Sequence, residues 1–143
     1  MEGGTAGCRA DFDSLLARDY EDARYFAVHR LFVDAYCLQH PDDFCRSAKS
    51  LAAHLVGLQA VVEGGGDTAR GPDALRRWLD GPGSLPKPQV PDARGGLTLS
   101  DLPRGDDPGA WAIAVRRWAD DVWAAYADLH PTARAWAGAA QNQ

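Results

Sequence analysis

Two histidines, His29 and His54, are the residues of this chain whose type and spacing most favour chemistry. They lie at about equal distances from His40-Pro41-Asp42, a sequence typical of a turn between two helices. If the two helices fold back on each other there, residues at equal distances from the turn reach the same height, because each helix rises about 1.5 Å per residue. The sequence therefore predicts two imidazoles that face each other, which is the beginning of a metal site or of an acid/base site.

A pair of imidazoles can bind a divalent metal ion such as Zn, Fe or Cu when one or two further ligands converge on it. His130, at the end of the last long helical segment, is the third candidate ligand, so the predicted metal set is His29, His54 and His130. His40 would lie roughly 16 Å from His29 along one helix, so these two cannot bind the same ion. The competing interpretation of the spacing is a pair of hydrogen-bonded core histidines.

Asp34 is the candidate catalytic residue. It lies inside the apolar sequence Leu31-Phe32-Val33-Asp34-Ala35-Tyr36, and counting from the turn places it level with Lys49. Because buried charges are normally paired, one interpretation is an ion pair between Asp34 and Lys49. The functional interpretation is that Asp34 orients a histidine, or acts as a general base with a raised pKa.

The length and composition favour one globular domain that spans residues 1–143. Of the 143 residues, 45% are apolar and five are tryptophan, which suffices for a packed core. Apolar positions recur at three- and four-residue steps, so the expected fold is all-α, a helical bundle of about four main helices. The segments expected to be helical are 11–17, 21–39, 43–63, 72–79, 108–129 and a last turn or two after Pro131.

Two segments are expected to lie outside the helices. Residues 1–10 should form a flexible N-terminus, and residues 81–107, rich in Pro and Gly, should form a long irregular arm. Within the arm, Gln89-Val90 and Leu97-Thr98-Leu99 can pair as a small β-hairpin.

Several classes of partner are disfavoured. The net charge is -5 and the basic residues form no stripe, so we expect no nucleic-acid binding. No apolar run approaches the roughly 20 residues of a membrane span, and the first residues do not resemble a secretory signal. We therefore expect a cytoplasmic protein.

The cysteines fit a reducing compartment. Cys8, Cys37 and Cys45 are odd in number and form no Cys-x-x-Cys pair. Cys37 and Cys45 flank the turn, so a local bridge or a soft metal ligand is conceivable, but small buried cysteines are the commoner situation.

The chain resembles a bacterial family, one of the domains of unknown function. The resemblance rests on His-Arg-Leu-x-Val-Asp-Ala-Tyr-x-x-Gln-His-Pro at residues 29–41, followed by His54 in a helix and by a C-terminal helix with Trp and His. It implies that the four histidines and Asp34 belong to the family pattern, which favours a metal site. This chain departs from the pattern in lacking a cysteine-rich beginning, in having Lys49 where glutamine is usual, and in having Leu129 in place of a histidine.

Three functions follow as candidates. The first is a histidine-centred divalent metal site, with an open coordination position that would suit an enzyme acting on a small-molecule substrate. The second is a non-catalytic interaction or regulatory module, in which the arm and Trp123 or Trp136 contact a partner or a second copy in a homo-oligomer. The third is a metal-free biosynthetic catalyst that binds an apolar substrate and uses Asp34 or a histidine to move a proton.

Overall fold

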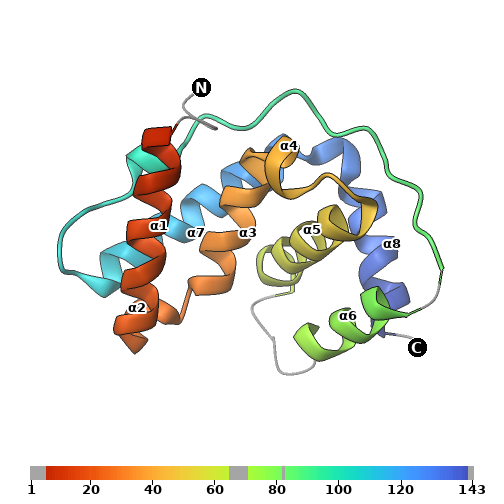
Figure 1. The fold of residues 1–143 in the computed structure, drawn as a ribbon, viewed down its shortest axis with the longest axis horizontal. Helices are drawn as coiled ribbons and strands as arrows, with labels where there is room; N and C mark the ends of the chain where they lie inside the picture. Colours follow the sequence, from red (N-terminus) through yellow and green to blue (C-terminus); the bar gives the residue numbers. More distant parts are fainter. Residues whose placement is uncertain (1–5, 65–70, 82, 142–143) are drawn as a thin grey trace.

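The described part of the chain is built from helices, short turns and one long arm (Figure 1). The computed structural model describes residues 6–64, 71–81 and 83–141. The elements in chain order are α1 (Ala6–Glu21), α2 (Ala23–Phe26), α3 (His29–Gln39), α4 (Pro41–Phe44), α5 (Ala48–Val62), α6 (Gly71–Asp80), the 3₁₀ turn η1 (Leu99–Asp101), α7 (Pro108–Ala125), the 3₁₀ turn η2 (Ala127–Leu129) and α8 (His130–Gln141).

Helices α3 and α5 form the centre of the bundle. Helix α3 places Phe32, Ala35 and Leu38 in the core with no exposed surface, at three-residue steps that keep them on one side of the helix. Helix α5 begins at a capping box, in which the Ser47 side chain accepts a hydrogen bond from the Ser50 backbone N–H and Ser50 reaches back to the backbone of Ser47. These two helices carry the residues of the candidate site.

Helix α7 covers the central pair with large aromatic side chains. Trp111 and Trp118 are almost completely buried, and both rings contact Phe32 of α3 at centroid distances of 5.6 and 5.9 Å. Just after α7, Tyr126 donates a hydrogen bond of 2.5 Å to the carbonyl oxygen of Leu38, near the C-terminal end of α3. Such rings bury large apolar areas, so α7 contributes much of the hydrophobic stabilisation of α3.

Helices α6 and α8 pack on the other side of α5. Trp136 of α8 is buried, and so is Leu75 of α6. At the surface, Arg134 of α8 forms an ion pair with Glu63 at the end of α5, and this contact lowers the pKa of Glu63 to about 2. Figure 1 shows α6 and α8 together on the side of the bundle away from α1 and α2.

The all-helical bundle is confirmed, with more breaks than the sequence indicated. The helix expected over 21–39 is divided at two places. Glu21 belongs to α1, Asp22 caps the separate short helix α2 by accepting from the backbone N–H of Arg24, and α3 begins at His29 after residues 27–28. The helix expected over 11–17 extends over Ala6–Glu21, so residues 6–10 are helical rather than flexible, and residues 1–5 lie outside the described part.

The arm is held against the bundle by backbone hydrogen bonds to side chains. The amide of Gln39 donates to the carbonyl oxygens of Arg94 and Leu97, at 2.9 and 2.6 Å, and the N–H of Leu97 donates to Asp121 at 2.9 Å. Gly95 has φ +91°, and any Cβ there would overlap the Asp121 carboxylate, so glycine is required. Residues 83–98 contain no strand, so the expected hairpin is not formed there. The contacts above hold this segment instead.

None of the helices that the structure describes combines the length and the apolar character of a membrane span.

Gln39 provides a test of how the arm is held. We expect Gln39→Ala to increase the rate at which trypsin cleaves the Arg94–Gly95 bond several-fold, because the substitution removes both hydrogen bonds that fix this segment. Gln59→Ala is the matched control, since the Gln59 amide hydrogen-bonds only the nearby Glu63 among the described residues. Equal cleavage rates in the two variants would contradict this role.

Candidate functional site

Asp34 and His54 lie directly opposite each other between α3 and α5. The His54 Nδ1 atom is 2.9 Å from Asp34 Oδ1. Asp34 is ten residues before Phe44 and His54 ten residues after it, so the register is counted from Phe44 rather than from Pro41. The reason is that Pro41–Phe44 forms its own short helix, α4, which displaces the centre of the turn along the chain.

This register corrects the expected ion pair between Asp34 and Lys49. The Lys49 ammonium donates a hydrogen bond of 3.2 Å to the carbonyl oxygen of Gly81, after α6. Lys49 therefore stabilises the end of a different helix, where a cation is favourable because of the unpaired carbonyl groups.

Asp34 is a fully buried carboxylate whose two oxygens are both bonded. Its side chain has 0% exposure and pairs with Arg30, one turn earlier on α3, through Nε at 2.9 Å to Oδ2 and 3.2 Å to Oδ1. The Arg30 guanidinium also donates through Nη2 to the carbonyl oxygen of Ala53, at 3.1 Å. Arg30 thus compensates the buried charge and joins α3 to α5, as a buried carboxylate requires.

The carboxylate fixes which nitrogen of the neutral His54 ring carries the proton. An ionised carboxylate can only accept hydrogen bonds, so Nδ1 of His54 carries the proton and Nε2 of the neutral ring carries a lone pair. Nε2 of His54 makes no hydrogen bond with the described residues, and the His54 side chain is 21% exposed. The ring can therefore accept a proton, or bind a metal, at a partly accessible atom.

Gly57 allows this close approach of α3 and α5. A Cβ built on Gly57 would overlap Oδ2 of Asp34 and lie 2.8 Å from Nη2 of Arg30. The glycine is therefore part of the site, because its missing side chain provides the space for the pair of Arg30 and Asp34. A glycine in the middle of an apolar helix was the sequence signal for this contact.

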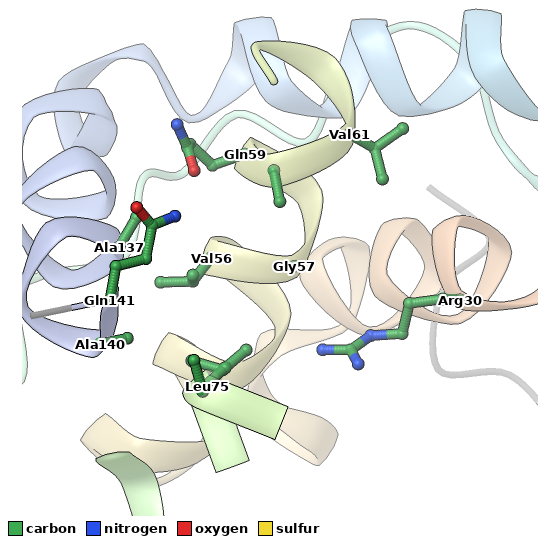
Figure 2. A pocket seen from close by; sticks show the side chains of 11 residues that line it. Arg30, Val56, Gly57, Gln59, Val61, Leu75, Ala137, Ala140 and Gln141 are labelled. Carbon is green, nitrogen blue, oxygen red and sulfur yellow. The ribbon is translucent and has the colours of Figure 1, made fainter. Parts of the chain in front are cut away.

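An apolar cavity adjoins the Arg30 and Asp34 pair, between α5, α6 and α8 (Figure 2). Its volume is about 60 Å³. In Figure 2 the Arg30 side chain extends toward α5 from one side, and Ala137, Ala140 and Gln141 of α8 lie on the opposite side. Gly57 and Arg30 both line the cavity and both contact Asp34, so the cavity wall and the buried carboxylate share residues.

His29 lies in a second carboxylate contact rather than against His54. Its Nδ1 atom is 3.1 Å from Oδ2 of Asp19, which is fully buried, and its ring stacks on Phe26 at a centroid distance of 4.7 Å. Burial raises the pKa of Asp19, and the hydrogen bond from His29 opposes this effect. The Tyr20 hydroxyl lies 3.4 Å from Nε2, so both ring nitrogens of His29 have partners.

His130 is also held by a local contact. Its Nε2 atom donates a hydrogen bond of 2.7 Å to the carbonyl oxygen of Trp123, and the two rings stack at a centroid distance of 3.8 Å. Nε2 therefore carries a proton and has no lone pair for a metal, whereas Nδ1 of the neutral ring keeps one.

The structure therefore brings Asp34 together with His54 but does not bring the three predicted metal ligands together. Among the described residues, no group of three or more His, Cys, Asp and Glu side chains is arranged to hold a metal ion. The metal site stays a prediction. Among the described contacts, Nε2 of His54 and Nδ1 of His130 have no hydrogen-bond partner, whereas both ring nitrogens of His29 have one.

The aromatic residues expected at an interaction surface are buried instead. Trp123 is 6% exposed and Trp136 is 8% exposed, because both face the core from α7 and α8. The large apolar side chains that are exposed in the described part are Tyr20, Phe26 and Ile113.

Comparison with known proteins identifies a family. The model of a family of unknown function, DUF5946, matches residues 1–127. Because this match covers most of the chain, the protein belongs to that family. Neither the curated proteins nor the solved structures compared with the chain gave a match.

Substitution of Gly57 tests the packing of the site, because the predicted change in the free energy of unfolding has a definite sign. We expect Gly57→Ala to lower the free energy of unfolding by about 1–3 kcal/mol, because the added methyl group must displace the buried pair of Arg30 and Asp34. The matched control is Gly138→Ala in α8, where a Cβ meets nothing within 4 Å. That change should stabilise the helix by about 0.5–1 kcal/mol. Urea unfolding measures both values, and a stabilising Gly57→Ala would contradict the packing described here.

Proposed function

We propose that this member of the DUF5946 family binds a small, mainly apolar molecule in the cavity between α5, α6 and α8, and that His54 exchanges a proton with it. The observation that carries the proposal is the fully buried Asp34, which bonds His54 on one side and Arg30 of the cavity wall on the other. The proposal corresponds to a metal-free catalyst, the third candidate function from the sequence.

The position of His54 on α5 relates it to the cavity. His54 precedes Gly57 by three residues, and residues three apart on a helix are neighbours on its surface. Gly57 lines the cavity, so the His54 ring lies within about one helical turn of the cavity wall. His54 is not itself among the residues that line the cavity, so the proposal requires a ligand that extends past Gly57 to reach the imidazole.

The proton would be accepted at Nε2 of His54. In the neutral ring this atom has a lone pair, and proton transfer to it produces an imidazolium next to Asp34. The carboxylate holds the ring in a fixed orientation, which is part of the usual task of an aspartate behind a catalytic histidine. Arg30 keeps the Asp34 carboxylate oriented and compensated while His54 changes charge.

The cavity lining indicates the chemical character of the ligand. Val56, Val61, Leu75 and the alanines of α8 supply apolar walls, and the Arg30 guanidinium, whose charge is paired with Asp34, supplies a polar group with N–H donors. A ligand with a small apolar body and one carboxylate or carbonyl group satisfies both features. A volume of about 60 Å³ accommodates only a small group, so a larger ligand would extend into the solvent.

A second candidate function, a divalent metal site, is favoured by the same pair. A carboxylate that accepts a hydrogen bond from a histidine commonly orients that histidine toward a metal. His54 would then supply one ligand through Nε2, and the remaining ligands for Zn, Fe or Cu would come from the bound molecule or from a second chain. Asp34 would act as the positioning residue in this case.

The first test is a ligand titration followed by NMR. We expect short-chain carboxylates such as butyrate to bind with a Kd of the order of millimolar, as suits so few atoms. Binding should perturb the backbone signals of Val61 and Leu75 and shift the imidazole signals of His54. Filling the cavity with Ala137→Leu should abolish these changes, whereas Ala139→Leu on the exposed face of α8 should not.

Two outcomes would contradict the proposal. The first is binding that leaves the His54 signals unchanged, since the cavity would then be unrelated to the imidazole. The second is that the purified protein contains a stoichiometric metal ion, and that this ion is absent from His54→Ala and present in His29→Ala. Elemental analysis gives this second result and would replace proton transfer by metal binding.

A further inference from the structure

The thiol of Cys8 and the imidazole of His40 meet at a place that shares no residue with the cavity lining. The Sγ atom of Cys8, in α1, lies 4.0 Å from Nε2 of His40 and 3.8 Å from the hydroxyl of Tyr36. His40 follows the last residue of α3 and is 7% exposed, so α1 and α3 hold the three groups together. A cysteine beside a histidine and a hydroxyl is the arrangement in which a thiol is activated.

His40 has the properties of a proton acceptor at this position. Burial lowers the pKa of His40, which favours the neutral ring with a lone pair over the imidazolium. Among the described residues, the charged groups that act on the ring are Asp43, which raises this pKa, and Arg94, which lowers it. The Tyr36 ring packs edge-on against the imidazole at a centroid distance of 4.3 Å, which fixes its plane.

The three cysteines of the chain differ in accessibility. Cys8 is partly exposed, whereas Cys37 and Cys45 are buried. Burial raises the pKa of both buried thiols to about 12, so very little of either is thiolate at neutral pH. Because the thiolate is the reactive form, Cys37 and Cys45 are inert in the folded protein and serve as internal references for Cys8.

We propose that Cys8 is a modification site for small electrophiles, in particular low-molecular-weight disulfides. Nε2 of His40 accepts the thiol proton, and the Cys8 sulfur attacks one sulfur of the disulfide. The S–S bond of the reagent breaks, the protein keeps one half as a mixed disulfide, and the other half leaves as a thiol that takes the proton from His40. A free thiol reverses the step, so the modification is reversible.

The experiment measures thiol reactivity in the folded chain with dithiodipyridine, a neutral aromatic disulfide that releases a coloured product. We expect one fast thiol per folded chain at pH 7, absent in Cys8→Ser. In His40→Gln the fast rate should fall about 10- to 100-fold, as expected from the loss of a general base. Tyr36→Phe, which keeps the ring that packs on His40, should change the rate by less than this factor.

The buried cysteines make the result interpretable. If His40→Gln disturbed the fold, Cys37 and Cys45 would become reactive in the same sample, and Cys8→Ala combined with His40→Gln would reveal this directly. The proposal is overturned if Cys8 in the folded wild-type chain reacts no faster than the thiols of the urea-unfolded chain. It is also overturned if His40→Gln reacts at the wild-type rate while Cys37 and Cys45 stay protected.

Discussion

A fully buried carboxylate is the constraint on which the centre of this structure depends. Transfer of the Asp34 side chain into the core is costly unless its charge is paired and its oxygens accept hydrogen bonds. Arg30 and His54 provide that pairing from the same helix and from the neighbouring one. The approach of α3 to α5 needed for these bonds requires a glycine at position 57. One charge thus links the two central helices, the orientation of an imidazole and part of the wall of a cavity.

The same physical rule explains the remaining histidines. His29 contacts the buried Asp19, His130 donates to a backbone carbonyl, and His40 is buried against Tyr36 and close to Cys8. Each ring is therefore bound to its own local partner, which accounts for the absence of a shared metal cluster among the described residues. The two carboxylate contacts differ in one respect. Both ring nitrogens of His29 have partners, whereas Nε2 of His54 is left without one in the described part of the chain.

The sequence predicted the helices well and the contacts between them less well. The all-helical bundle followed from apolar periodicity, and the burial of Asp34 followed from its apolar neighbours, because both are local properties of the chain.

The partner of Asp34 depended on the register of a turn, and α4 shifted that register by a few residues. With this shift, the residue of α5 that faces Asp34 is His54 instead of Lys49. The contact between His29 and Asp19 was missed because it joins α1 to α3 across the separate short helix α2, whereas the sequence predicted one continuous helix over 21–39. Arg30 was overlooked because it is not unusual until the neighbouring helix is in place, and the glycine inside the apolar helix, Gly57, was not interpreted as a close contact between helices.

The most direct test of this account is the tautomer of His54, measured by long-range ¹⁵N–¹H correlation in a histidine-labelled sample. The hydrogen bond to Asp34 predicts that Nδ1 carries the proton and Nε2 does not in the neutral ring, and that Asp34→Ala removes this preference while the bundle stays folded. A His54 ring protonated at Nε2 in the wild-type protein, or one whose tautomer is the same with and without the Asp34 carboxylate, would contradict it.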